Sequence, residues 1–92
     1  MPYAIEIEPR ARRQIRALPR DVQRRLTNAL AQLADQARPP DARRLAGHDR
    51  IYRIRVGAYR ILYEIEDRIQ IVLVIEVGHR REVYEHFRRR RR

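Results

Sequence analysis

The sequence predicts an α+β domain in which a two-helix hairpin and a short C-terminal helix pack on an antiparallel sheet. Three observations predict it: an alternating apolar–acidic run near the N-terminus, two segments of helical periodicity, and three β-rich runs in the second half. The expected order is β-α-α-β-β-β-α. Residues 1–92 fit one domain, and an apolar fraction of 43% suffices for one modest core.

The first strand is expected over residues 3–8, "YAIEIE", where apolar side chains alternate with glutamates. This alternation is typical of a strand with one buried face. Pro9 suits the first turn of the following helix, and Pro19 ends that helix. The apolar residues between the two prolines recur at helical spacing: Ala11, Ile15 and Leu18.

A second helix is expected over residues 21–37, with Asp21 as its N-cap. One side of this helix carries an apolar stripe: Val22, Leu26, Ala29, Leu30 and Leu33. Because the break at Pro19 is short, the two helices should fold back as a helical hairpin.

Residues 38–50 contain two prolines and a glycine and are expected to form a connecting loop. Three β-rich runs follow, "IYRIRV", "YRILYEIE" and "RIQIVLVIEV", and they predict an antiparallel meander. The last run is apolar on both faces, which favours a central position in the sheet. Gly78 is expected to end it, before a short helix, "RREVYEHF", and a basic tail at 88–92.

Gly57-Ala58 is expected to form a type II′ turn, which favours glycine at its first central position. In that register Arg55 faces Arg60. Arg53, Arg55 and Arg60 then share one face of the sheet, and apolar or aromatic side chains share the other. The predicted pairs are Val56–Tyr59, Arg55–Arg60, Ile54–Ile61 and Arg53–Leu62.

The charge predicts an anionic partner. All 22 basic residues are arginine, against 12 acidic residues, so the formal net charge is +10. Such an excess is typical of a protein that binds nucleic acid or an acidic protein. Like charges directly opposite each other destabilise a sheet, so the hairpin arginines require an anionic ligand or nearby carboxylates, for which Glu64 and Glu76 are candidates. The alternative interpretation is a solvated face that prevents aggregation.

The last β-rich run returns antiparallel and should bring Arg80 to the edge that holds Arg55 and Arg60. Tyr84 follows within the next helical turn. Four cations and an aromatic ring at one end of a sheet fit a phosphate-rich strand, because guanidinium groups bind phosphate and rings stack on bases. The alternative for Tyr84 is a ring that packs on the sheet.

Several classes of protein lack their signatures in this chain. There is no cysteine, which excludes a disulfide framework and a cysteine-based zinc site. His48, His79 and His86 are isolated and lack metal-ligand spacing. No segment has the length and composition of a signal peptide or a transmembrane helix. There is no Walker loop, dinucleotide-binding motif or Ser/His/Asp order.

The chain resembles the RelE branch of the RelE/ParE toxins of bacterial and archaeal toxin–antitoxin modules. The resemblance rests on "YRIRVGAYRILYEIED" followed by "VLVIEVGHRREVY", and extends to "YAIEIEPRARRQIRALP" and "RRLAG". It implies a RelE-like microbial RNase fold. It also implies a ribosome-dependent endoribonuclease that cuts mRNA in the ribosomal A site through attack of the 2′-hydroxyl, with no metal or cofactor, and so inhibits translation.

The resemblance also implies roles for individual residues. The catalytic set is Arg55, Arg60, Arg80 and Tyr84; Arg60 and Arg80 would clamp the scissile phosphate. Further RNA contacts would come from Arg53, Arg55, Arg43 and Arg44. Family relatives carry lysine where this chain has Arg53 and Arg55, and arginine is a poor general base. His79 and His86 are the candidate bases.

The implied partners are a cognate RelB-like antitoxin, in a heteromeric complex, and mRNA on the 70S ribosome with contacts to 16S ribosomal RNA. The implied location is cytoplasmic, without membrane association. Two other functions stay open: inhibition of DNA gyrase, as in the ParE branch, and RNA binding by a basic module without catalysis. In the ParE branch the set of residues at the positions of Arg53, Arg55, Arg60, Arg80 and Tyr84 is generally incomplete, which favours the nuclease.

Overall fold

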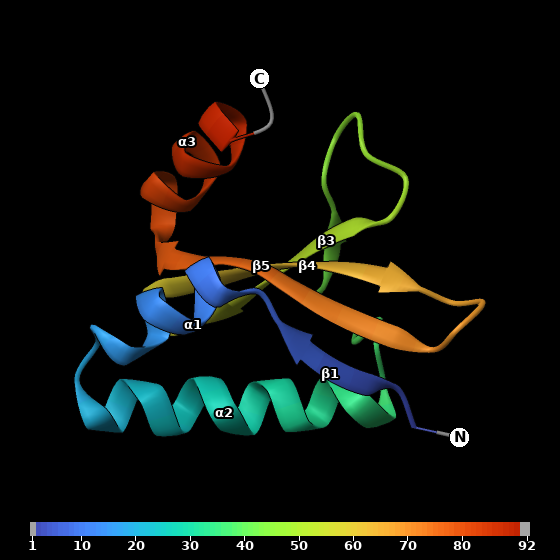
Figure 1. The fold of residues 1–92 in the computed structure, drawn as a ribbon, viewed down its shortest axis with the longest axis horizontal. Helices are drawn as coiled ribbons and strands as arrows, with labels where there is room; N and C mark the ends of the chain where they lie inside the picture. The colour runs from blue at the N-terminus through green and yellow to red at the C-terminus, as the bar shows by residue number, and fades with distance from the viewer. Residues whose placement is uncertain (1, 91–92) are drawn as a thin grey trace.

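Three helices flank a five-stranded sheet in the computed structural model, which describes residues 2–90 (Figure 1). The elements are β1 (Ala4–Ile7), α1 (Pro9–Arg16), α2 (Arg20–Asp35), β2 (Arg43–Arg44), β3 (Ile51–Val56), β4 (Tyr59–Glu66), β5 (Ile71–His79) and α3 (Arg80–Arg90). The predicted α+β class is confirmed. Among the described residues, no helix combines the length and apolar character needed to cross a membrane.

The strands lie in the order β1-β5-β4-β3-β2, and β3, β4 and β5 form the predicted antiparallel meander. The sheet differs from the prediction in two ways. β1 pairs in parallel with β5, so the sheet is mixed. Part of the predicted loop, Arg43–Arg44, forms the short edge strand β2 beside β3. Local alternation predicts that a segment is extended, but it does not select the partner strand, which depends on distant parts of the chain.

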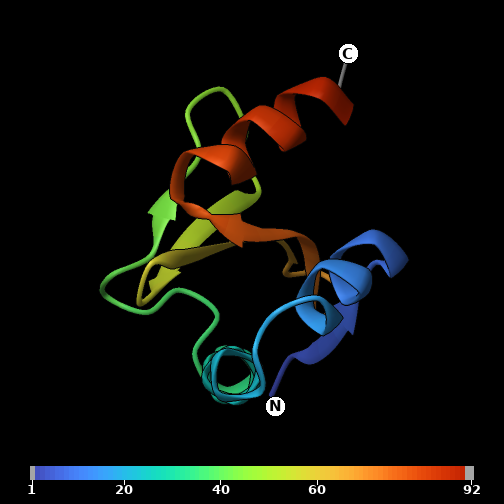
Figure 2. The ribbon, with the colours of Figure 1, turned by 90° about the vertical axis from the view of Figure 1, so that its left-hand side faces the viewer.

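Apolar side chains form a separate core on each face of the sheet. Figure 2 shows α2 end-on below the sheet and α3 above it. The larger core joins the apolar stripe of α2 to the strands; its fully buried members include Leu26, Ile61, Tyr63, Val72 and Val74. The smaller core holds α3 on the other face: Ile51, Leu62, Ile75, Val83 and Phe87.

Two helix boundaries follow from proline. α1 begins at Pro9, as predicted, because proline lacks only an N–H that the first turn leaves unbonded. α2 begins at Arg20 with Pro19 as its N-cap residue, so the prediction of Asp21 as N-cap is wrong. Asp21 lies in the first turn, where its carboxylate still interacts favourably with the helix dipole.

The last strand and the last helix both extend further toward the C-terminus than predicted. β5 continues through Gly78 to His79, and α3 runs to Arg90. Three residues of the predicted tail, 88–90, are therefore helical, because the helix of which "REVYEHF" is part continues without a glycine or proline to end it. Residues 91 and 92 of the predicted tail lie outside the described residues.

Along the second half of β5, beyond its pairing with β1, a side chain of α1 forms hydrogen bonds with the strand edge. β1 pairs only with residues 71–74 of β5. Beyond them, the Val77 N–H donates to Gln14 Oε1 at 2.8 Å, and Gln14 Nε2 donates to Glu76 Oε2 at 2.8 Å. Glu76 is fully buried and also forms an ion pair with Arg10 at 3.1 Å. The carboxylate considered as a partner for the hairpin arginines thus binds two side chains of α1.

Asp67, in the turn between β4 and β5, joins three distant parts of the chain. Its carboxylate accepts a hydrogen bond from the Tyr3 hydroxyl at 2.6 Å and two from the Arg38 guanidinium at 3.1 and 2.8 Å. Arg38 also lies over the Tyr52 ring and donates to its hydroxyl. These bonds, from Arg38 and then from Tyr3, lower the pKa of Asp67 from 3.8 to about 2.

We expect Asp67→Asn to remove a stabilising contribution that depends on pH. The pKa of Asp67 is lower in the folded chain, so the contribution is fully present above about pH 4 and is lost as the pH falls to about 2. The difference in free energy of unfolding between wild type and variant, measured by urea unfolding, should shrink as the pH falls from about 4 to about 2. Glu6→Gln, which removes an exposed strand carboxylate, is the control. A gap that stays constant with pH would contradict the assignment.

Candidate functional site

The β3–β4 hairpin has the predicted turn and register. Gly57 has φ of 62°, in the left-handed region that glycine adopts readily, and the turn contains only Gly57 and Ala58. The four predicted pairs are all present: Val56–Tyr59, Arg55–Arg60, Ile54–Ile61 and Arg53–Leu62. The aromatic and apolar members Tyr52, Ile54, Val56, Tyr59 and Ile61 face the larger core, as predicted.

Arg53, Arg55 and Arg60, the hairpin arginines, lie on the opposite face, which α3 partly covers. Arg53 is paired with Leu62 of the smaller core, and Arg55 lies directly opposite Arg60. Within residues 2–90, neither Arg53 nor Arg55 forms an ion pair or a side-chain hydrogen bond. Elsewhere in the described part of the chain, arginines that are paired with carboxylates include Arg10, Arg38 and Arg50. The hairpin therefore presents positive charge that no carboxylate of the described chain neutralises.

Tyr84 completes this site from α3. Its neighbours Val83 and Phe87 are buried in the smaller core, which fixes the side of the helix that faces the sheet. The Tyr84 hydroxyl accepts a hydrogen bond from Arg60 Nη1 at 2.7 Å, and the Arg60 guanidinium carbon lies 5.3 Å from the centre of the Tyr84 ring. Tyr84 is half-buried, so it both packs on the sheet and reaches the arginine.

Arg80 is the first residue of α3. Gly78 pairs with Arg60, so the Arg80 backbone follows two residues after that pair, at the edge where the sequence predicts it. The side chain of Arg80 lies outside the described part of the structure.

Arg43 and Arg44 lie on the edge strand β2. Arg43 pairs with Arg53, which places it on the face of the hairpin arginines, and Arg44 pairs with Tyr52 on the other face. The Arg43 guanidinium donates to the carbonyl oxygens of Pro40 and Ala42 at 2.9 and 3.0 Å. Only Arg43 of this pair therefore extends the basic face.

The three histidines lie in different surroundings. His79 pairs with Tyr59 and packs edge-on against its ring, on the face of the larger core, opposite the Arg60 side chain. His86 is half-buried on α3, two residues after Tyr84. His48 packs against Phe87. In the described chain, no group of three or more His, Cys, Asp or Glu side chains could hold a metal ion.

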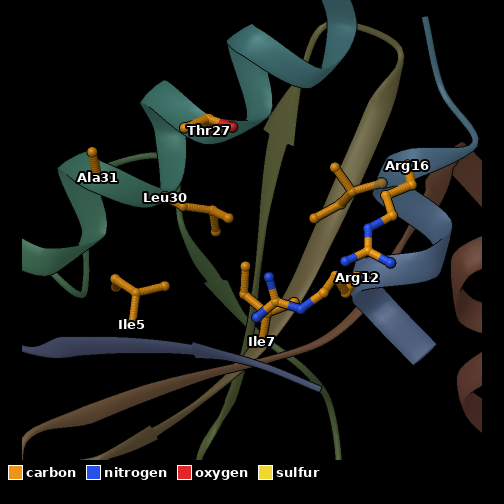
Figure 3. A pocket seen from close by; sticks show the side chains of 8 residues that line it. Ile5, Ile7, Arg12, Arg16, Thr27, Leu30 and Ala31 are labelled. Carbon is orange, nitrogen blue, oxygen red and sulfur yellow. The ribbon is translucent and has the colours of Figure 1, made fainter. Parts of the chain in front are cut away.

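A groove lies between β1, α1 and α2, away from the hairpin arginines (Figure 3). Its floor is apolar, from Ile5 and Ile7 of β1 and Leu30 of α2, and the side chains of Arg12 and Arg16 extend toward it from α1. The sequence predicts an apolar face on β1 and another on α2. It does not predict the groove between them, because the position of β1 depends on its parallel pairing with β5.

Sequence reasoning also missed Arg25. A β-carbon at Gly57 would lie 3.0 Å from Arg25 Nη1, so the guanidinium of this α2 residue lies beside the hairpin turn. Arg25 is one of many arginines on the helices, and no sequence signal distinguishes it from its neighbours.

The chain matches the family model of the ParE toxin of the type II toxin–antitoxin system parDE over residues 5–84. It is 34% identical to the toxin RelG of Mycobacterium tuberculosis, with 91% of this chain and 98% of the relative covered. The family match therefore runs from within β1 to within α3.

Solved structures of RelE toxins are also similar to this chain in fold. The free-state structure of an Escherichia coli RelE toxin with two arginines replaced by alanine has a TM-score of 0.82 and 29% identity, and covers 98% of each chain. The toxin in the intact E. coli RelBE toxin–antitoxin complex has a TM-score of 0.75 and 28% identity, with 84% of this chain and 95% of that chain covered.

Proposed function

The chain belongs to the ParE toxin family of type II toxin–antitoxin systems, within the RelE/ParE superfamily, and from this premise we propose that it is a ribosome-dependent mRNA endoribonuclease. It would act in the ribosomal A site, in the cytoplasm, and inhibit translation. The observation that carries the proposal is the arrangement of Arg55, Arg60 and Tyr84 on one face of the sheet. This arrangement suits a phosphate flanked by an aromatic ring.

The proposed reaction needs no group from outside the chain and the RNA. The 2′-oxygen attacks the adjacent phosphorus, the bond to the 5′-oxygen breaks, and the products are a 2′,3′-cyclic phosphate and a 5′-hydroxyl. A base takes the proton from the 2′-hydroxyl, and an acid supplies a proton to the departing 5′-oxygen, so there is no net gain or loss of protons. Arg60 and Arg80 would neutralise the charge that develops on the phosphorane oxygens, and Arg55 and Arg53 would bind flanking phosphates.

Tyr84 would hold Arg60 in place and offer its ring to a nucleotide. Its hydroxyl accepts one hydrogen bond from Arg60, and Arg60 has further N–H groups to donate to phosphate. The arginines are poor general bases because a guanidinium does not give up its proton in a protein. The rate enhancement would come mainly from in-line positioning and charge neutralisation. Of the candidate bases, His86 lies two residues after Tyr84 on α3, a spacing at which helical side chains do not face each other, and the His79 ring packs on the opposite face of the sheet.

We further propose that a RelB-like antitoxin partners the chain in a heteromeric complex, as RelB partners RelE in the E. coli complex. The groove between β1, α1 and α2 suits an amphipathic helix of the antitoxin. Apolar residues of this chain form the floor of the groove, and Arg12 and Arg16 would pair with acidic residues of the antitoxin helix. A second antitoxin segment would occlude the basic face or displace α3.

Gyrase inhibition is the second candidate, because the matching family model is that of ParE. Induction of a gyrase inhibitor would arrest replication and damage DNA, while translation would continue at first. The hydrogen-bonded Arg60–Tyr84 pair favours the nuclease over this candidate.

The proposal is tested by incubating the purified chain with mRNA on stalled ribosomes and with the same mRNA alone. We expect cuts in the A-site codon that leave 5′-hydroxyl ends, and a much slower reaction on naked RNA. Cleavage at equal rates on both substrates would exclude dependence on the ribosome. Intact mRNA together with inhibited gyrase supercoiling would favour the second candidate.

A further inference from the structure

The hairpin turn is approached by a cation from the side of α2. The first half of α2 lies at the end of the molecule where β3 joins β4 and where α3 begins (Figure 1). From this half-helix, Arg25 extends so far that a β-carbon at Gly57 would lie 3.0 Å from its Nη1 and 3.7 Å from its guanidinium carbon. Only the lack of a side chain at Gly57 leaves this space open.

Arg25 has no polar partner that explains its position. It is exposed, and within residues 2–90 it forms no ion pair and donates no side-chain hydrogen bond. Its guanidinium lies beside a turn that Arg55 and Arg60 flank, on the other side of the turn from those two side chains. A guanidinium without a carboxylate partner has its N–H groups available to bind an anion that passes over the turn.

We propose that Arg25 binds an RNA phosphate at the hairpin turn, on the side of the turn opposite the hairpin arginines. This inference rests on RNA being the ligand in the proposed function. The positive surface would then continue from Arg60 and Arg55, around Gly57, to Arg25, so that the phosphodiester backbone passes over the turn. Arg25 is a positioning residue, because the reacting phosphate lies at Arg60.

The competing interpretation is that Arg25 only covers the turn with the apolar part of its side chain. The two interpretations differ in the salt dependence of RNA binding. Each phosphate contact contributes a slope of about 0.7 to the plot of log affinity against log salt for a single strand. A side chain that only packs contributes nothing to this slope.

The test measures binding of a 2′-O-methyl RNA oligonucleotide, which cannot be cleaved, over a salt series. We expect Arg25→Ala to weaken binding several-fold, up to about tenfold, at low salt and to reduce the slope by about 0.7. Arg25→Lys should keep most of the slope because the charge remains. Arg24→Ala, which removes the exposed arginine that precedes Arg25 in α2, is the matched control.

Three results would overturn the inference: a slope that Arg25→Ala leaves unchanged on both the oligonucleotide and vacant ribosomes, an equal change for Arg24→Ala, or loss of the slope in Arg25→Lys. Urea unfolding of each variant shows whether the fold is retained. Parallel binding to vacant ribosomes identifies the source of the phosphate. An effect on the oligonucleotide assigns Arg25 to the mRNA, and an effect confined to ribosomes assigns it to ribosomal RNA. Because binding is measured without cleavage, a wild-type chain that binds RNA but does not cut it would refute the nuclease and leave this test intact.

Discussion

Arg60→Ala is expected to lower the rate of mRNA cleavage on ribosomes by about 100- to 1,000-fold. Removal of one preorganised donor that stabilises developing charge costs this much in enzymes whose transition states are stabilised by hydrogen bonds. Arg60 is also the partner of the Tyr84 hydroxyl at 2.7 Å, so its loss releases the ring that it orients. Single-turnover cleavage of mRNA on stalled ribosomes measures the effect without contributions from product release.

The control for charge is Arg68→Ala, which removes an exposed arginine from the β4–β5 turn at the other end of the sheet. It should reduce cleavage only slightly. Tyr84→Phe keeps the ring and removes the hydroxyl, and should fall between wild type and Arg60→Ala. If Arg60→Ala retained wild-type cleavage, Arg60 would not be the residue that stabilises the transition state.

Phe87→Ala is expected to detach α3 while the rest of the chain stays folded. Phe87 is 2% exposed and belongs to the smaller core, which holds α3 on the sheet independently of the larger core. Truncation of a buried phenylalanine costs about 3–5 kcal/mol, enough to shift the docking equilibrium of the helix by more than about 100-fold. Hydrogen exchange should show loss of protection in α3 but not in β4, and cleavage should fall because Tyr84 leaves Arg60.

Ile69→Ala is the matched control for this variant, because it removes a large apolar side chain that is 58% exposed. It should leave both hydrogen exchange and cleavage unchanged. A Phe87→Ala protein in which β4 and α3 lose protection together would show that the two cores unfold as one unit.

The hairpin could be predicted from sequence because every rule it obeys is local. The alternation of arginine with isoleucine and tyrosine sets the faces, and Gly57 sets the turn, so a slip of one residue would bury Arg55. The helices were predicted for the same reason. Asp21 failed as an N-cap because Pro19 already starts the helix, a competition that the pattern of side chains does not resolve.

The features that were missed depend on contacts between distant segments. The pairing of β1 with β5 cannot be read from either strand, and the groove beside β1 exists only because of it. The Glu76 carboxylate binds Gln14, 62 positions earlier in the chain, and Arg10, both from α1. Arg25 reaches Gly57 across the gap between a helix and a turn, so its place depends on how α2 lies on the sheet.

The parallel pairing of β1 with β5 also bears on when the protein can become active during its own synthesis. Ala4 pairs with Ile71, 67 positions later (71 − 4), so the sheet closes only after most of the chain has been made. Contacts of such high sequence separation slow folding relative to local ones. Tyr84 emerges later still, after β5 is complete. A nascent chain that has reached only β4 thus has the hairpin arginines but lacks β5, α3 and Tyr84, so the candidate site is incomplete until α3 has been made.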